Sequence, residues 1–317
     1  MAIGRSKVAV VGVGAVGAAV AFDLVMNHIC DELVLINRNR EKAWAEATDL
    51  QHSLGYSGNK MSVRNGDFQD CHDTDLVVIS AALPYKTGQT RLDMLEQAAG
   101  VMEDIVPSIM ESGFSGIFVV ITNPVDVMTY YVQKLSGLPS NKVIGTGTVL
   151  DSARLKYYLA DVMDVDSQSV HAICMGEHGD SQVIPWSQIT VGGKRFLDIL
   201  HDNKELLKGF DIYQVAENIK LIAYRIVNAK GATTFGIAET TVQIIKAILK
   251  NENKVIPVSA MLNGEYGEED VYAGVPAVLN SQGIKELVEY HLLDKEMAKL
   301  KKSISIIKEY NKQLKLR

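Results

Sequence analysis

The stretch "KVAVVGVGAVGAAVAFDLV", residues 7–25, constrains the fold more than any other part of the chain. An apolar, β-branched run leads into Gly12, Gly14 and Gly17, and a helix-forming apolar stretch follows. Three glycines at this spacing allow a tight turn, a close backbone approach to a pyrophosphate, and close packing of helix on strand. The start of the helix also presents unpaired N–H groups to phosphates. The segment therefore predicts the first strand of a parallel sheet, with a dinucleotide-binding site in the turn that follows the strand.

The residue that follows the second predicted strand bears on the choice of dinucleotide. Asn37 stands there, where NAD-binding proteins of this kind usually carry Asp or Glu. A carboxylate accepts hydrogen bonds from both ribose hydroxyls and repels the extra phosphate of NADP, whereas an amide accepts fewer and repels nothing. Arg38 and Arg40 follow, and we favour solvated charges at a helix start over phosphate ligands. We predict NAD as the cofactor, with its preference over NADP left open.

Alternating short apolar runs and longer helical stretches fill the first half of the chain, as a parallel sheet with helical crossovers requires. We expect a helix over residues 92–112, ended by Gly113, and strands at 7–13, 32–36, 61–64, 76–81, 117–121 and 142–144. Beyond about residue 148 the pattern predicts a helix, then hairpin-like strands at 171–175 and 188–191, two helices, and strands around 255–261 and 271–279. The predicted fold class is α/β: a Rossmann-type doubly wound parallel sheet over residues 1–147, followed by a mixed α+β substrate-binding and catalytic domain over residues 148–317.

Composition excludes several classes of function. The net charge of −6 over 317 residues shows no basic excess that would hold a nucleic-acid backbone. The three cysteines lie far apart without metal-ligand spacing, so we expect reduced thiols and no metal site. The apolar run 8–26 contains the glycine motif, which a signal peptide or membrane span does not need. The last helix has an apolar stripe opposite its lysines, which favours docking on the core over a membrane contact. We therefore expect a cytoplasmic protein without nucleic-acid or membrane partners.

Asp151, Arg154 and His178, in the second half of the chain, form a candidate catalytic group. "MGEHGDSQ" sets His178 between two glycines just after a predicted strand, and "GTGTVLDSARLKYYL" offers Asp151 and Arg154 one helical turn apart. Such a group can reduce a 2-oxo acid. The Arg binds the carboxylate through two hydrogen bonds, the protonated His gives its proton to the carbonyl oxygen as a hydride arrives, and the Asp orients the ring and stabilises its cation.

The motifs "GVGAVG", "TNPVDV", "GTGTVLDSAR", "GEHGDS" and "KGATTFG" appear in the order and spacing of the lactate/malate dehydrogenase family, which the chain resembles over essentially its full length. The resemblance implies the activity of a bacterial-type L-lactate dehydrogenase. By the same resemblance His178 would be the proton donor and acceptor, Asp151 its partner, Arg154 the carboxylate anchor and Arg91 a loop residue that polarises the carbonyl. Thr233 would form a pocket wall. The cofactor is expected to contact Gly12, Gly14, Val16, Gly17, Asn37, Ala81 and Asn123, the last of which would also touch the substrate.

The loop "AALPYKTGQTRLD", residues 81–93, occupies the position of this family's lid, with Gly88 as a plausible hinge. Tyr85 stands where lactate enzymes usually carry Gln and malate enzymes Arg. Without a cation there, the second carboxylate of oxaloacetate would be buried without a full charge partner, at a cost of several kcal/mol, although Lys86 could partly pair it. We expect a monocarboxylic 2-oxo acid, most simply pyruvate. A 2-hydroxyisocaproate-type or aromatic 2-hydroxy acid dehydrogenase stays open, and malate is less favoured. The intact catalytic residues argue against a nucleotide sensor without activity.

Assembly and regulation follow from the resemblance alone. Bacterial lactate dehydrogenases often bind fructose 1,6-bisphosphate between subunits through an Arg and a His. Here His171 occupies the His position, but Lys156 replaces the Arg and offers a mobile ammonium in place of a planar fork. Only six residues precede the first strand, so we expect this N-terminus to lack the arm that braces the tetramers of animal relatives. We expect a homodimer or homotetramer whose activity responds little to the bisphosphate.

Overall fold

The computed structural model describes residues 5–58, 60–83, 91–203 and 208–314, without the side chains of residues 91 and 92. Within them, six parallel strands lie in the order β3-β2-β1-β4-β5-β6. Their bounds are β1 Lys7–Val11, β2 Glu32–Ile36, β3 Ser62–Asn65, β4 Leu76–Ile79, β5 Ile117–Val120 and β6 Val143–Gly145. This order reverses between β1 and β4, and ligands of doubly wound sheets bind outside the carboxyl ends of the strands at such a point.

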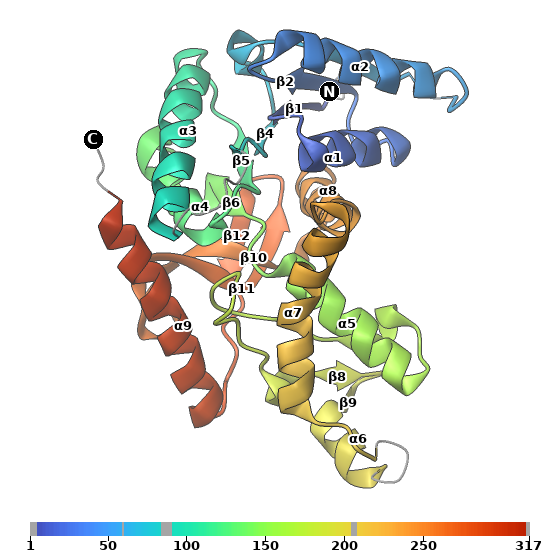
Figure 1. The fold of residues 1–317 in the computed structure, drawn as a ribbon, viewed down its shortest axis with the longest axis vertical. Coiled ribbons are helices and arrows are strands. Elements are labelled where there is room, and N and C mark those ends of the chain that lie inside the picture. Colours follow the sequence, from blue (N-terminus) through green and yellow to red (C-terminus); the bar gives the residue numbers. More distant parts are fainter. Residues whose placement is uncertain (1–4, 59, 84–90, 204–207, 315–317) are drawn as a thin grey trace.

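Helices connect these strands and cover the sheet. They are α1 Ala15–Met26, α2 Arg40–Leu54, α3 Arg91–Glu111 and α4 Val125–Ser136. In Figure 1, α3 and α4 pack together on one side of the strands, and α1 packs against the later helix α8 (Phe235–Leu249) on the other. Strands β4 to β6 are buried on both faces and are therefore apolar along their whole length, as β5 "IFVV" illustrates, whereas the edge strand β3 "SVRN" is partly exposed.

Three antiparallel strands of the second half extend the same sheet. They are β10 Lys254–Asn263, β11 Glu269–Asn280 and β12 Gly283–Leu287, and β10 joins β6 where Ser259 pairs with Gly145. The remaining helices are α5 Val149–Met163, α6 Phe196–Asp202, α7 Ile212–Lys230 and α9 Asp294–Gln313. One hydrophobic core runs from the parallel strands through β10 and β11 to α9. The sequence pattern did not predict that the sheet continues across residue 148.

A smaller layer lies below this sheet in Figure 1. It holds a three-stranded sheet of β7 Val170–His171, β8 Thr190–Val191 and β9 Lys194–Arg195. Helices α5, α6 and α7 surround a second hydrophobic cluster there, with Leu155 and Phe196 fully buried at its centre. Short 3-10 helices complete the described chain: η1 Phe68–Cys71, η2 Ser140–Lys142, η3 Ser167–Ser169, η4 Trp186–Gln188 and η5 Glu265–Gly267.

The predicted α/β fold class is confirmed, and several element boundaries differ from expectation. The strand predicted at 7–13 ends at Val11, because Gly12 turns the chain with a φ of +94°. The strands predicted at 171–175 and 188–191 shorten to two residues each, and three helices rather than two lie between the small sheet and β10. On α9 the stripe of Leu300, Ile304 and Ile307 is fully buried, so this helix docks on the core as predicted. No helix in the described ranges is both long and apolar enough to span a membrane.

Candidate active site

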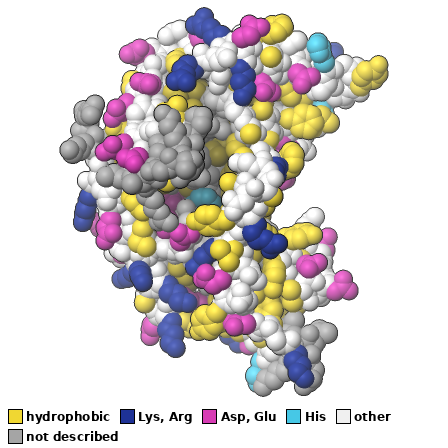
Figure 2. Space-filling model, viewed as in Figure 1, with side chains coloured by type: hydrophobic (Ala, Val, Ile, Leu, Met, Phe, Trp, Pro, Cys, Tyr) yellow, Lys and Arg dark blue, Asp and Glu magenta, His cyan; other side chains and the backbone are white. Residues whose placement is uncertain are grey.

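Two adjoining cavities open at the carboxyl ends of the parallel strands. Their volumes are about 310 and about 550 Å³, and five residues line both: Met94, Asn123, Arg154, His178 and Ala223. The smaller cavity extends toward α9 and α7, and the larger one toward the start of α1. Figure 2 shows that this face of the molecule is hollowed near its middle, with hydrophobic side chains at the rim. Two connected cavities offer room for two molecules that meet near His178.

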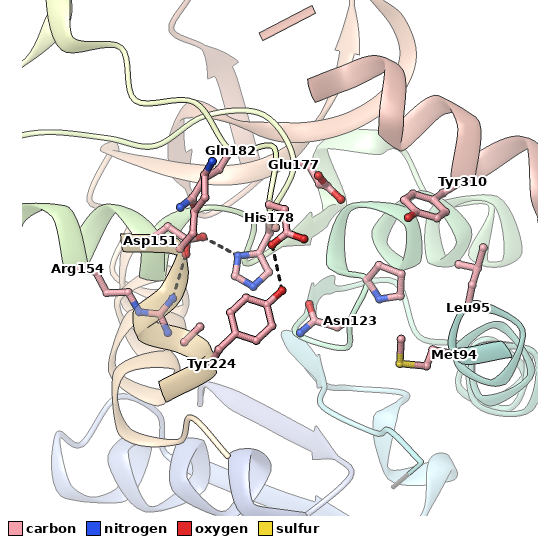
Figure 3. Close-up of a pocket in the computed structure, with 15 residues that line it drawn as sticks. Met94, Leu95, Asn123, Asp151, Arg154, Glu177, His178, Gln182, Tyr224 and Tyr310 are labelled. Carbon is pink, nitrogen blue, oxygen red and sulfur yellow. Dashed lines mark hydrogen bonds and ion pairs between the residues drawn. The ribbon is translucent and has the colours of Figure 1, made fainter. Parts of the chain in front are cut away.

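Three predicted catalytic residues form one connected group at this junction (Figure 3). Nδ1 of His178 lies 2.6 Å from Oδ2 of Asp151, and Nη1 of Arg154 donates to Oδ1 of the same carboxylate over 3.1 Å. The Asp151 side chain is 5% exposed and that of Arg154 10%, whereas 26% of the His178 side chain remains exposed. The second ring nitrogen of His178 is thus left free of Asp151 to face a substrate.

The electrostatics of the group favour a charged imidazole. Burial works against the charge, but the negative charge of Asp151 and its hydrogen bond, joined by Asp126, outweigh burial and the positive Arg154 and raise the pKa of His178 to about 9. Burial also acts against the charge of Asp151, yet His178 and Arg154 hold the pKa of that carboxyl below its ordinary value. At neutral pH the pair is therefore an imidazolium and a carboxylate, and the ring can donate a proton.

Local structure places Asp151 next to both Arg154 and His178. Asp151 lies in the first turn of α5, and Arg154 follows three residues later on the same face. At the same start of α5, Oγ1 of Thr148 donates to the carbonyl of Cys174 over 2.6 Å, and the Cys174 N–H donates to Oγ of Ser152 over 2.8 Å. These buried bonds tie the start of α5 to the segment that leads into His178.

The glycine motif has the geometry that a bound dinucleotide requires. A Cβ on Gly12 would lie 2.6 Å from the backbone of Ala81, and a Cβ on Gly17 would collide with the carbonyl oxygen of Gly12. Gly14, the N-cap of α1, differs because nothing described lies within 4 Å of a Cβ placed there. Two glycines thus serve close packing, and the middle one leaves open space in front of the helix N-terminus, where a pyrophosphate fits. Val16, in the first turn of α1, lines the larger cavity.

Asn37 follows β2 and contacts the glycine loop. Its Oδ1 accepts the Val13 N–H over 3.3 Å, and its Nδ2 donates to the carbonyl of Asn39 over 3.2 Å. The side chain therefore lies next to the motif, at the position where a ribose hydroxyl would be read. Arg38 and Arg40 are exposed, and Arg40 begins α2.

The other predicted residues divide into two groups. Thr233 and Asn123 line the larger cavity, with Asn123 also reaching the smaller one. Tyr85, Lys86 and Gly88 lie outside the described residues, as does the side chain of Arg91, whose backbone begins α3.

The sequence interpretation missed Asp126, which accepts the His178 backbone N–H over 2.8 Å. In the sequence it is one of six residues of the motif "TNPVDV". An acidic residue in the first turn of a helix is common, so its type alone gives no signal of contact with a distant loop.

Comparison with known proteins agrees with this geometry. Residues 6–145 match the lactate/malate dehydrogenase NAD binding domain, and residues 148–315 match the lactate/malate dehydrogenase alpha/beta C-terminal domain. L-lactate dehydrogenase 2 of Bacillus cereus (strain ZK / E33L) is 46% identical over 306 residues, which cover 96% of this chain and 97% of that protein. L-lactate dehydrogenase 3 of Bacillus thuringiensis subsp. konkukian (strain 97-27) is 44% identical over 308 residues, which cover 97% and 98%.

Solved structures show the same likeness. The minor L-lactate dehydrogenase from Enterococcus mundtii in its ligands-bound form superposes with a TM-score of 0.96 at 42% identity, over 99% of each chain. The ligands-unbound form gives 0.91 at 40% identity, over 100% of each chain. With both domain models matched and relatives far above 30% identity along nearly the whole length, the chain belongs to the lactate/malate dehydrogenase family.

Proposed function

We propose that this protein is an NAD-dependent L-lactate dehydrogenase, which interconverts pyruvate and L-lactate. The observation that carries the proposal is the linked group of His178, Asp151 and Arg154 at the junction of two cavities. The names of the relatives in Bacillus and the NAD-binding family domain support the same activity and cofactor.

The substrate side of the mechanism follows from Arg154 and His178. Arg154 uses one nitrogen for Asp151, and its remaining donors bind the carboxylate of the 2-oxo acid. The ring nitrogen of His178 that does not face Asp151 then gives its proton to the carbonyl oxygen. Asp151 keeps the ring oriented and stabilises its cation until the proton leaves. By the family resemblance Arg91 would polarise the carbonyl from the lid, and Asn123 and Thr233 would complete the pocket.

NADH, when bound, supplies the hydride that reduces the carbonyl carbon. The residues proposed to hold it are Gly12, Gly14, Val16, Gly17, Asn37, Ala81 and Asn123. The open space before α1 and the unpaired N–H groups there suit the phosphates, and Asn37 would accept from the ribose. Because the pKa of His178 is raised to about 9, pyruvate reduction proceeds at neutral pH, whereas lactate oxidation gains as the pH rises and the ring becomes neutral.

Several finer points belong to the same proposal. The substrate is a monocarboxylic 2-oxo acid because Tyr85 supplies no cation for a second carboxylate. The division at residues 147 and 148, a cytoplasmic location and a homodimer or homotetramer are further parts of it. Lys156 is half-buried on α5 and His171 exposed on β7, and burial together with Lys254 lowers the pKa of Lys156. A lysine that holds its charge less firmly suits a weak response to fructose 1,6-bisphosphate.

A substrate panel tests the proposal. The purified protein would be assayed by NADH absorbance with pyruvate, oxaloacetate, 2-oxoisocaproate and phenylpyruvate, and again with NADPH. We expect the highest kcat/KM for pyruvate with NADH. A higher value for either larger 2-oxo acid would replace lactate by a 2-hydroxyisocaproate-type or aromatic substrate, and a higher value for oxaloacetate would show that a cation other than residue 85 pairs its second carboxylate.

A further inference from the structure

Two buried side chains from distant elements hold the main chain at His178. The Glu177 N–H donates to Oγ of Ser303 on α9 over 2.8 Å, and the next N–H, that of His178, donates to Oδ2 of Asp126 on α4 over 2.8 Å. Ser303 is fully buried and Asp126 is 2% exposed. Consecutive amides of the loop are thus fixed from two sides, once by a neutral hydroxyl and once by a carboxylate.

The second oxygen of Asp126 is also engaged. Oγ of Ser259, fully buried on β10, donates to Oδ1 of Asp126 over 2.6 Å. Although Asp126 lies in the first turn of α4, these partners stand 52 and 133 residues away along the chain. The carboxylate therefore joins the loop of His178 to the central sheet, which is more than a helix cap requires.

The charges around this carboxylate act on the proton that His178 carries. Burial raises the pKa of Asp126 to about 6, while Ser259, the His178 amide and the His178 ring lower it and Glu177 opposes them. Asp126 is thus largely ionised at neutral pH. Around the ring itself, Asp151 and Asp126 favour the charged form, and Arg154 disfavours it. His178 lies within the field of two carboxylates, only one of which touches the ring.

We propose that Asp126 is a positioning residue for proton transfer, which fixes the main chain of His178 and, through its charge, helps Asp151 keep the ring protonated. This inference rests on the proposed function, because it deepens the role of His178 in reducing the 2-oxo acid. A neutral residue of the same shape would keep the position of the loop and lose the effect on the proton.

The variant Asp126→Asn separates the two effects. Its amide oxygen can still accept the His178 N–H, and its nitrogen can donate to Ser259, so the shape is kept and only the charge is lost. We expect the alkaline midpoint of kcat/KM for pyruvate to fall by about one pH unit, as for loss of a nearby opposite charge. Above that midpoint the variant should be several-fold slower than the wild type.

Ser303→Ala is the matched control, because it removes the neighbouring tether without changing any charge. We expect it to lower kcat without moving the midpoint. If Asp126→Asn leaves the midpoint unchanged, or if Ser303→Ala moves it equally, the electrostatic role is wrong. Should Asp126→Asn fail to fold, Asp126→Ser decides, because its hydroxyl can still accept the His178 N–H and carries no charge; a midpoint at the wild-type value would overturn the proposal.

A readout without turnover keeps this inference separate from the proposed function. NMR titration of the His178 ring, assigned by its absence in His178→Asn, measures the pKa directly in the unreacted protein. A lower ring pKa in Asp126→Asn supports the inference even if the wild type reduces no 2-oxo acid, and that inactivity would overturn only the proposed function. An unchanged ring pKa in an active enzyme would overturn only the role of Asp126.

Discussion

Replacing Asp151 by Asn removes the charge that most favours the protonated His178 while keeping the size of the side chain. The raised pKa of His178, about 9 against 6.5 for an ordinary His, spans about 2.5 pH units. At about 1.4 kcal/mol for each unit, the site stabilises the imidazolium by about 3 kcal/mol. Without Asp151, burial and Arg154 act against the charge and Asp126 still favours it; because burial is the largest of these effects, we expect the pKa of His178 in the variant to lie at or below about 6.5.

The expected loss of activity depends strongly on pH. At pH 8 about nine-tenths of the wild-type rings carry the proton, whereas a pKa of 6.5 leaves about 3%, so protonation alone predicts about a 30-fold loss of kcat/KM for pyruvate. At pH 6 the same calculation leaves less than a twofold loss. A loss from a misoriented ring multiplies kcat/KM by the same factor at both pH values and leaves the ratio of the two losses unchanged.

The assay is the pH profile of kcat/KM for NADH-dependent pyruvate reduction, measured for both proteins from pH 5 to 10. Stability gives a second readout. Since the folded-state pKa of His178 is raised, its contribution is complete below about pH 6.5 and is lost as the pH rises toward 9. The wild type should therefore lose stability over that range, and Asp151→Asn should show less of this loss. A deficit in the variant that is the same at pH 6 and pH 8 would refute the reasoning.

The remaining predictions concern substrate and cofactor. Arg154→Lys should raise the KM for pyruvate about tenfold or more, because an ammonium cannot make the two-bond fork; unchanged steady-state kinetics would place the carboxylate elsewhere. Asn37→Asp should shift the ratio of NADH to NADPH affinity about tenfold toward NADH in fluorescence titrations, since a carboxylate accepts from the ribose and repels the extra phosphate; a constant ratio would remove Asn37 from the ribose site. Gly17→Ala should destabilise the fold by about 1–3 kcal/mol in denaturant unfolding because its Cβ meets the carbonyl of Gly12. Gly14→Ala, its control, should keep stability and weaken NADH binding; a destabilised Gly14→Ala would show that this space serves packing.

The sequence predicts the bounds of a helix or strand best where neighbouring residues alone determine them. The strand at Glu32–Ile36 has the predicted bounds, because an apolar run between polar residues has no competing structure. The strand that starts at Lys7 ends two residues early, because the conformation of Gly12 interrupts the ladder before the apolar residue Val13. Residues 171–175 have strand character in their sequence but find a partner strand for only a short length.

Long-range contacts limited the prediction of the site. The group of His178, Asp151 and Arg154 was predicted because these residue types, at this spacing, are typical of 2-oxo acid reduction, and the resemblance implied the role of each. Asp126 was missed because its contacts to the His178 amide and to Ser259 span the chain and leave no periodic pattern. The junction of β6 with β10 depends on one pairing between residues over a hundred positions apart, which no local signal encodes.

The most direct test of the central claim is a single-turnover reaction of the NADH-loaded protein with pyruvate, followed by NADH absorbance and by chiral analysis of the product. The wild type should oxidise its NADH at neutral pH and yield L-lactate. His178→Asn should bind NADH with unchanged affinity and oxidise it about 10²–10⁴-fold more slowly, the usual contribution of a general acid. Rapid oxidation by His178→Asn, or a product other than L-lactate from the wild type, would contradict the account.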